Sequence, residues 1–275
     1  MSDVDVSDSS VLGTTMRGQA RLIVVLGDAQ TVKESAKKIK ALGNIVRVAR
    51  GVFLIHGQLT KSPSVLYTLP TISFQKAREI PSVSERGEDA SSRRVYAVIS
   101  YRFKNPTAIQ KKRVERLVRK SISIRLRPGV LLFPVLKSKD RRRLLDSDET
   151  NKLMSSRKVS EELRILGADV SRWTRLKLMN NHSNVHDAVV RTLSQDISYI
   201  ETLAKDLRTQ AKAPDAQLTI LRKRYSILSR RYRELKIKWS LSNKVWNYDA
   251  AKLLTRAYNM VIAARRAIEA STWEG

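Results

Sequence analysis

The side chains best suited to chemistry in this sequence are lysines and arginines that gather between residues 111 and 143. They fall on a predicted helix, on the strand that follows it and in the next turn: Lys111, Lys112, Arg113, Arg116, Arg119, Lys120, Arg125, Arg127, Arg141, Arg142 and Arg143. Such cations neutralise the closely spaced phosphates of a nucleic acid. Strict alternation with Ile124 and Leu126 predicts that the two strand arginines point to the same face. This segment is therefore a candidate phosphate-binding surface.

A second basic set lies on a predicted helix over residues 218–239. Its members are Arg222, Lys223, Arg224, Arg230, Arg231, Arg233, Lys236 and Lys238. Only Glu234 opposes them, and like charges along a helix destabilise it. We expect a nucleic acid, or the acidic face of a protein partner, to relieve this repulsion. Trp246 and Trp273 lie off the apolar seam of the helices and are candidates to stack on bases, although packing is the preferred interpretation.

The overall charge supports the same expectation. The chain has 275 residues, with 53 Lys and Arg against 26 Asp and Glu, and a formal charge of +27. Residues 93–150 hold 17 basic and 5 acidic side chains, and residues 216–275 hold 13 and 4, so these two segments carry most of the surplus. Surfaces usually mix both signs to limit self-repulsion. A polyanion is the expected partner, and an acidic protein is the alternative.

The sequence offers little for catalysis. It has no cysteine, which excludes thiolate metal sites and cysteine nucleophiles. No phosphate-loop, dinucleotide-binding, serine-hydrolase or zinc-protease motif occurs. His182 and His186 lie four residues apart beside Asp187, the spacing of a helical metal site, but no third ligand is evident. We expect no catalytic residue, no metal and no cofactor.

One enzymatic alternative stays open, a metal-dependent nuclease. Carboxylates that could hold Mg²⁺ for phosphodiester cleavage follow the first basic segment, at Asp140, Asp146, Asp148 and Glu149. Because three arginines lie among them at 141–143, a charged turn is the preferred interpretation.

The elements that position the first basic segment are repeated along the chain. Apolar patterning predicts strand, helix, strand, strand over about residues 21–60 and again over about 94–137. The sequences RVARGVFLI at 47–55 and RLRPGVLLF at 125–133 match in frame. A repeat of this kind predicts a duplicated βαββ, ferredoxin-like two-layer sandwich over residues 17–150, with a linker at about 75–92.

The second half, residues 151–275, has a helical period. Seven positions of one predicted helix are spaced alternately three and four apart, which is a heptad seam: Leu218, Leu221, Tyr225, Leu228, Tyr232, Leu235 and Trp239. Together with predicted helices before and after it, this indicates an antiparallel helical bundle or a coiled-coil hairpin. The seam can pair within the chain or between two copies, so a homodimer is one alternative. The expected fold class is α+β.

The stretch 94–136 carries a family resemblance. Its hydrophobic strand ending in tyrosine (Tyr96 to Tyr101), its basic helix and the sequence Gly129-Val130-Leu131 resemble ferredoxin-like units of three families. These are the CRISPR spacer-acquisition endonucleases, the phenylacetate-type repressors and the chromate-resistance regulators. The resemblance implies a shared binding scaffold. In the endonucleases an aspartate closes the first strand, where this chain has Ser100-Tyr101-Arg102-Phe103, so the resemblance does not extend to their catalysis.

The N-terminal residues and the length of the apolar runs indicate where the protein is located. Residues 1–16 are acidic and serine-rich, which predicts a disordered tail and no secretory signal. No apolar run approaches the roughly 20 residues that cross a bilayer, so we expect no transmembrane segment and a cytoplasmic protein.

The function expected is a non-enzymatic nucleic-acid-binding protein, either a DNA-binding transcription regulator or an architectural factor. The alternative is an interaction subunit of a ribonucleoprotein or DNA-processing complex. Phosphate contacts alone do not separate DNA from RNA.

Overall fold

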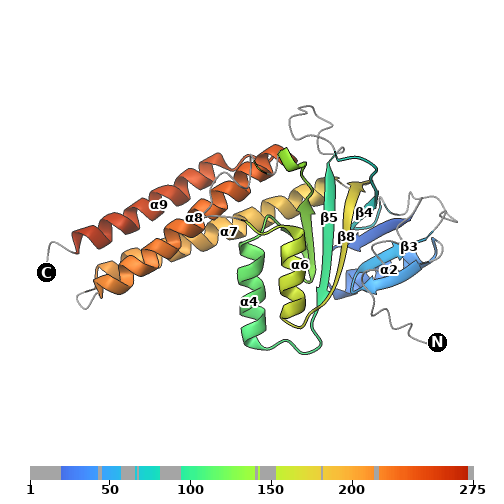
Figure 1. Cartoon of the computed structure of the whole chain (residues 1–275), viewed down its shortest axis with the longest axis horizontal. Coiled ribbons are helices and arrows are strands. Elements are labelled where there is room, and N and C mark those ends of the chain that lie inside the picture. The colour runs from blue at the N-terminus through green and yellow to red at the C-terminus, as the bar shows by residue number, and fades with distance from the viewer. Residues whose placement is uncertain are drawn as a thin grey trace. The chain divides into compact units, whose positions relative to one another are not determined.

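The computed structural model describes residues 20–42, 45–56, 66, 68–80, 94–139, 142, 153–180, 182–213 and 217–271 (Figure 1). The predicted tail at 1–16 and residues 81–92 of the predicted linker lie outside these ranges, and residues 75 and 76 belong to a strand. The chain divides into two units, residues 1–141 with 154–189, and residues 142–153 with 190–275. The protein is α+β, as the sequence predicts.

The first unit is built on one eight-stranded antiparallel sheet with the order β2-β3-β1-β4-β8-β5-β7-β6. Its first half contains β1 (Arg21–Val25), α2 (Ala29–Lys40), β2 (Ile45–Ala49), β3 (Val52–Ile55) and β4 (Thr71–Lys76). Its second half contains β5 (Val95–Arg102), α4 (Ala108–Arg119), β6 (Ile124–Arg127), β7 (Val130–Pro134), α6 (Ser156–Ile165) and β8 (Asp169–Leu178). The strand order within each half is the same, and β4 pairs with β8 to join the halves.

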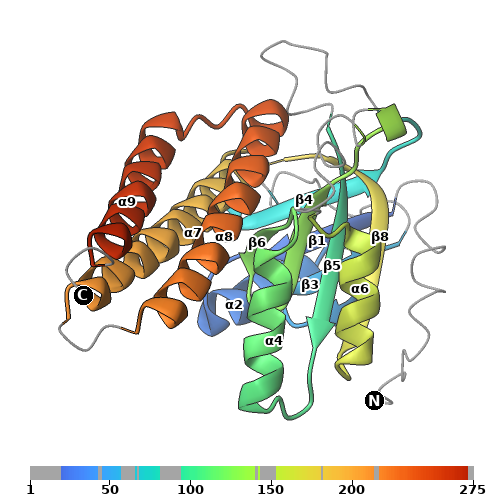
Figure 2. The ribbon, with the colours of Figure 1, turned by 60° about the vertical axis from the view of Figure 1, so that its left-hand side comes forward.

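The strands β3 and β7 are buried at every residue, as expected for near-continuous apolar strands that are covered on both faces. On one face of the first half, Val32 and Ile39 of α2 pack into a cluster with Ile23, Val25 and Phe53. In the second half, α4 and α6 lie side by side over the sheet (Figure 2).

Helix α4 has a capped N-terminus and buries an apolar stripe on one side. Thr107 and Gln110 form a reciprocal capping box, in which each side chain accepts a hydrogen bond from the other residue's backbone N–H. Val114, Leu117 and Val118 are buried. Ile109, which the periodicity assigns to the same apolar stripe, is 66% exposed, so that assignment is wrong. It lies in the first turn, before the buried part of the stripe begins.

Both halves of the sheet contain a β-bulge at the same place. The pairing of β2 with β3 shifts between Arg47 and Ala49, and the pairing of β6 with β7 shifts between Arg125 and Arg127. Each bulge is followed by a glycine in the left-handed region, Gly51 with φ +74° and Gly129 with φ +80°. The in-frame match of the two sequences thus reflects a shared backbone shape.

The bulge overturns the expected direction of the two strand arginines. Arg125 pairs with Leu131 and Arg127 pairs with Val130. Neighbouring residues on β7 point to opposite faces, and cross-strand partners share a face. The two arginines therefore point to opposite faces, because the bulge inserts a residue into the strict alternation that the sequence suggests.

One strand within residues 151–275 is not predicted by the sequence. The elements α6 and β8 belong to the sheet unit, so the helical part does not begin at 151 as expected. The buried residues of β8 include Val170, Trp173 and Leu176, three apart, and Arg175 has φ +56°. The pairing of β5 with β8 also shifts within this strand. This irregularity removes the alternation of buried and exposed residues that marks a strand. The remaining spacing of three residues resembles the period of a helix.

The second unit contains most of α7 (His182–Ala211), together with α8 (Leu218–Trp246) and α9 (Ala251–Ala270). The heptad seam of α8 is satisfied inside the chain: Leu221, Leu228 and Leu235 are buried, and Tyr232 lies against Tyr258 and Leu254 of α9. Figure 1 shows the three helices side by side. None of the described helices combines the length and apolar character needed to cross a bilayer.

Replacing Gly51 by alanine should destabilise the protein more than replacing Gly167. Both glycines have positive φ, +74° and +86°, where a Cβ costs about 1 kcal/mol. A Cβ at position 51 would also overlap the Nη1 atom of Arg127, whereas at position 167 the nearest atom is Gln110 Nε2 at 3.8 Å. Chemical denaturation of the two variants measures the difference. Equal decreases in stability would contradict the close approach of Arg127 to Gly51.

Candidate nucleic-acid interface

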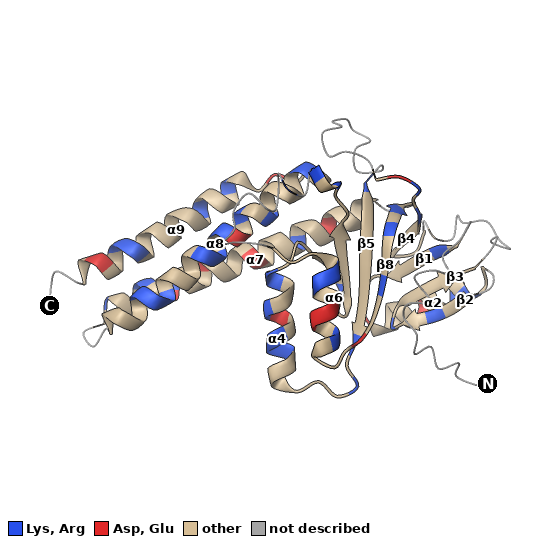
Figure 3. Cartoon of the chain, in the orientation of Figure 1, with Lys and Arg blue, Asp and Glu red and all other residues tan. Residues whose placement is uncertain are grey.

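Five of the six cations predicted on the helix that forms α4 are exposed to solvent. The exposed members are Lys111, Lys112, Arg113, Arg116 and Lys120, whereas Arg119 is partly buried. The helix contains one acidic residue, Glu115, and its carboxylate is engaged by Arg125. Basic residues follow one another along this helix in Figure 3. This surface, called the α4 face below, keeps the positive charge that the sequence predicts.

The two strand arginines are not part of that exposed surface. Arg125 is about one-third exposed, and its Nη2 lies 2.9 Å from Glu115 Oε1, so its charge is compensated within the fold. Arg127 is only 7% exposed and donates from Nη1 to the carbonyl oxygen of Val25 at 2.7 Å. The prediction that both arginines extend one exposed basic surface with the helix is therefore wrong.

The turn arginines are largely outside the described part of the chain. Arg142 is exposed, while Arg141 and Arg143 lie outside it. The carboxylates of the nuclease alternative, Asp140, Asp146, Asp148 and Glu149, also lie outside it. His182 and His186 are exposed at the start of α7. Within the described residues, no group of three or more His, Cys, Asp and Glu side chains could hold a metal ion.

The basic residues of α8 divide into exposed and internal ones. Arg222, Lys223, Arg224, Arg230, Arg233 and Lys236 are exposed, and these six are called the α8 face below. Arg224 donates to Gln210 Oε1 at 2.6 Å, and Arg230 lies 4.0 Å from Glu234. Exposed pairs of this kind contribute little to stability and are screened by salt.

The other two predicted cations of α8 serve the packing of helices. Lys238 is buried, and its Nζ lies 2.8 Å from Asp196 Oδ2 of α7. Arg231 donates to the hydroxyl of Tyr199 at 2.6 Å and lies over that ring, 5.4 Å from its centroid. Lys238 is therefore not available to phosphates, and Asp196 is a second carboxylate that opposes this helix.

The structure does not place Trp246 where it could stack on a base. Trp246 is only 6% exposed and ends α8 among buried residues, so it packs inside the helical unit. Trp273 lies outside the described residues.

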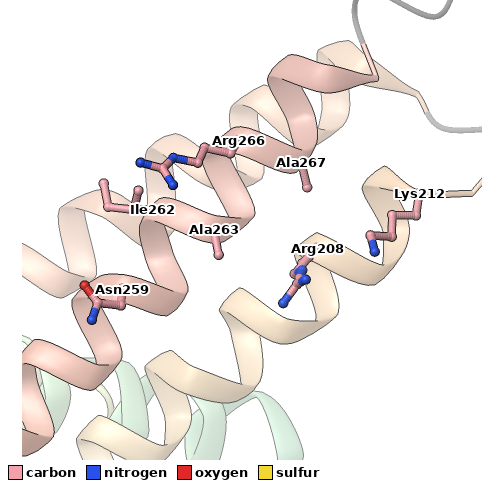
Figure 4. Close-up of a pocket in the computed structure, with 7 residues that line it drawn as sticks. All are labelled: Arg208, Lys212, Asn259, Ile262, Ala263, Arg266 and Ala267. Carbon is pink, nitrogen blue, oxygen red and sulfur yellow. The ribbon is translucent and has the colours of Figure 1, made fainter.

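A basic groove between α7 and α9 is not anticipated by the sequence. It has a volume of about 510 Å³ and is lined by Arg208, Lys212, Asn259, Ile262, Ala263, Arg266 and Ala267. In Figure 4 the two alanines of α9 are directed toward α7, which carries Arg208 and Lys212. No lining residue is acidic. The sequence gives little indication of this groove, because its cations are spread over two helices and none belongs to a dense basic run.

Comparison of the sequence with models of known protein families gives no match, and comparison with curated proteins gives none either. Charge and burial are therefore the basis on which a function can be assigned.

Asp196→Ala should destabilise the protein by about 3 kcal/mol, because it leaves a buried ammonium group without its counter-charge. Lys238 is 3% exposed and Asp196 is 21% exposed, which places the effect near the lower end for buried pairs. The double variant Asp196→Ala/Lys238→Met should recover most of that stability, since the lysine then becomes an apolar side chain of similar length. Urea denaturation of wild type and both variants measures this. If the single variant is as stable as wild type, Lys238 is not an internal residue.

Proposed function

We propose that the protein binds a nucleic acid through phosphate contacts and acts as a DNA-binding transcription regulator or architectural factor, without catalysing a reaction. The observation that carries this proposal is the α4 face, where five exposed cations share a helix whose only carboxylate is already paired. We further infer that the two halves of the sheet are a duplicated ferredoxin-like unit and that α7, α8 and α9 form an antiparallel bundle.

The α4 face suits a chain of phosphates better than a single anion. Its cations lie on the outward side of one helix and point to solvent, where an isolated ion pair contributes about 1 kcal/mol or less. A polyanion gains from many such contacts together, because each neutralised phosphate releases condensed counterions. Affinity of this origin is large at low salt and falls steeply as salt is added. The α8 face has the same character and supports the same ligand.

A second candidate function is favoured by the groove between α7 and α9. Its lining includes Ile262, Ala263 and Ala267 together with three cations. Apolar contact combined with positive charge suits an acidic amphipathic helix of a protein partner. This supports an interaction subunit as the alternative to a protein that binds nucleic acid directly.

The triple variant Lys112→Gln/Arg116→Gln/Lys120→Gln should weaken binding of a duplex oligonucleotide at low salt. On a plot of log K against log salt, the slope should become shallower by about 0.9 for each phosphate that is no longer neutralised, or by up to about 3 for all three. Fluorescence anisotropy over a salt series, with DNA and RNA duplexes, measures the slopes.

The matched control is Lys33→Gln/Lys37→Gln/Lys40→Gln, which removes three exposed cations from α2 of the same unit. Its slope should stay close to that of wild type. Identical slopes for the α4 variant and the control would show that only total charge matters, and no binding by wild type in dilute buffer would refute the proposal.

A further inference from the structure

Hydrogen bonds join helices α7 and α9 on either side of the basic groove. Arg256 of α9 donates to the two carboxylate oxygens of Glu201, at 2.6 and 2.9 Å. Further along, the hydroxyl of Ser271 donates to the carbonyl oxygen of Ala211. Both helices advance from the first contact to the second, so they run parallel to each other. The residues that α9 contributes to the groove, within 259–267, all lie between the two contacts.

The groove carries positive charge that no carboxylate of the described residues neutralises. Arg208, Lys212 and Arg266 line it and are exposed, and none of them forms an ion pair within the described part of the chain. The acidic residue of α9, Glu269, is already paired within that helix. Asp206 of α7 does not line the groove, because residues two apart on a helix do not share a face. The groove therefore favours an anionic occupant.

The floor of the groove is apolar and open. It is formed by Ile262, Ala263 and Ala267, each of which is partly exposed. The two alanines are four residues apart, so they lie one above the other on α9 and form a row of small side chains (Figure 4). Such a row lets another helix approach closely. No lining residue is buried, so the groove does not enclose a ligand as a small-molecule pocket does.

Helix α8 packs against α7 and α9 without entering the groove. It contacts α7 through the ion pair of Lys238 with Asp196, and it contacts α9 through Tyr232 and Tyr258. None of the groove's lining residues comes from α8. A helix placed in the groove would thus touch α7 and α9 only, which is the position of a fourth helix in a four-helix bundle.

We propose that the groove between α7 and α9 binds one acidic amphipathic helix of a partner protein, as a fourth helix beside these two. The proposal rests on the second candidate function, an interaction subunit, and gives the chemistry of its partner. Carboxylates along the sides of such a helix would meet the three cations, and small apolar residues between them would cover the alanines. The lining residues of α9 span about 12 Å, so a helix of about three turns is long enough. A second copy of the chain fits poorly, because its exposed α4 and α8 faces are themselves cationic.

The probe for this site is a fluorescent peptide of about 18 residues, which is long enough to populate a helix in water. It consists of alanine, leucine and glutamate, with the leucines on one face and the glutamates on either side of them. Fluorescence anisotropy on adding the whole chain should show binding by wild type. Arg208→Gln/Arg266→Gln should bind the peptide about tenfold more weakly, because two carboxylates lose their partners. The matched control, Lys33→Gln/Lys37→Gln, removes two exposed cations from α2 and should bind like wild type.

Ala263→Arg separates recognition of a helix from simple attraction between charges. The new side chain occupies the apolar floor and adds a positive charge. It should therefore weaken binding of the peptide, whereas attraction of a polyanion would increase. A thermal melt shows whether this variant is folded, and Arg208→Gln/Arg266→Gln tests the site without altering its floor.

The proposal is wrong if wild type does not bind the peptide, or if it binds a shuffled peptide of the same composition as tightly. It is also wrong if Arg208→Gln/Arg266→Gln changes the salt dependence of oligonucleotide binding but not peptide binding, since the groove would then hold a nucleic acid. A dimer that Ala263→Arg converts to a monomer would assign the groove to a second copy and contradict the proposal as well. Oligonucleotide binding by the α4 face is tested with other variants, so either proposal can fail while the other holds.

Discussion

The bulge that precedes a left-handed glycine at the end of β2 and β6 is the constraint on which the sheet unit depends. The bulge ends each edge strand and lets the backbone turn back. The carbonyl oxygen of Gly51 then accepts a hydrogen bond from the backbone N–H of Val25, and that of Gly129 accepts one from the backbone N–H of Tyr101. The bulge also sends the side chains before and after it to opposite faces. As a result Arg125 meets α4, whereas Arg127 crosses to β1 and links the two halves.

The basic residues that give the chain its large positive charge fall into two groups. Some cations are internal and have structural partners, as Lys238 has Asp196 and Arg125 has Glu115. Others are exposed to solvent on α4 and α8. Only the second kind bears on a polyanionic partner. A count of basic residues therefore overstates the positive charge that is exposed, and burial decides which residues contribute to it.

The sequence predicts the elements whose period is regular. The strand, helix, strand, strand order of both halves, the buried side of α4 and the seam of α8 all follow from apolar spacing. The strand β8 escapes prediction because an irregularity near Arg175 breaks its alternation. The internal position of Lys238 could not be predicted, because it depends on a carboxylate 42 residues away on another helix. The direction of Arg127 depends on a register shift, which leaves no mark on residue composition.

The exposed and the buried cations should respond differently to salt, and this difference follows from burial. The α4 face is exposed, so counterions compete with a ligand at every contact and screen it over about 10 Å at 0.1 M salt. Arg127 is removed from solvent, and counterions in solution screen a buried charge far less. Among the described residues the two halves differ in charge compensation: Arg125 is paired with Glu115, whereas Arg47 at the matching position before the bulge forms no ion pair.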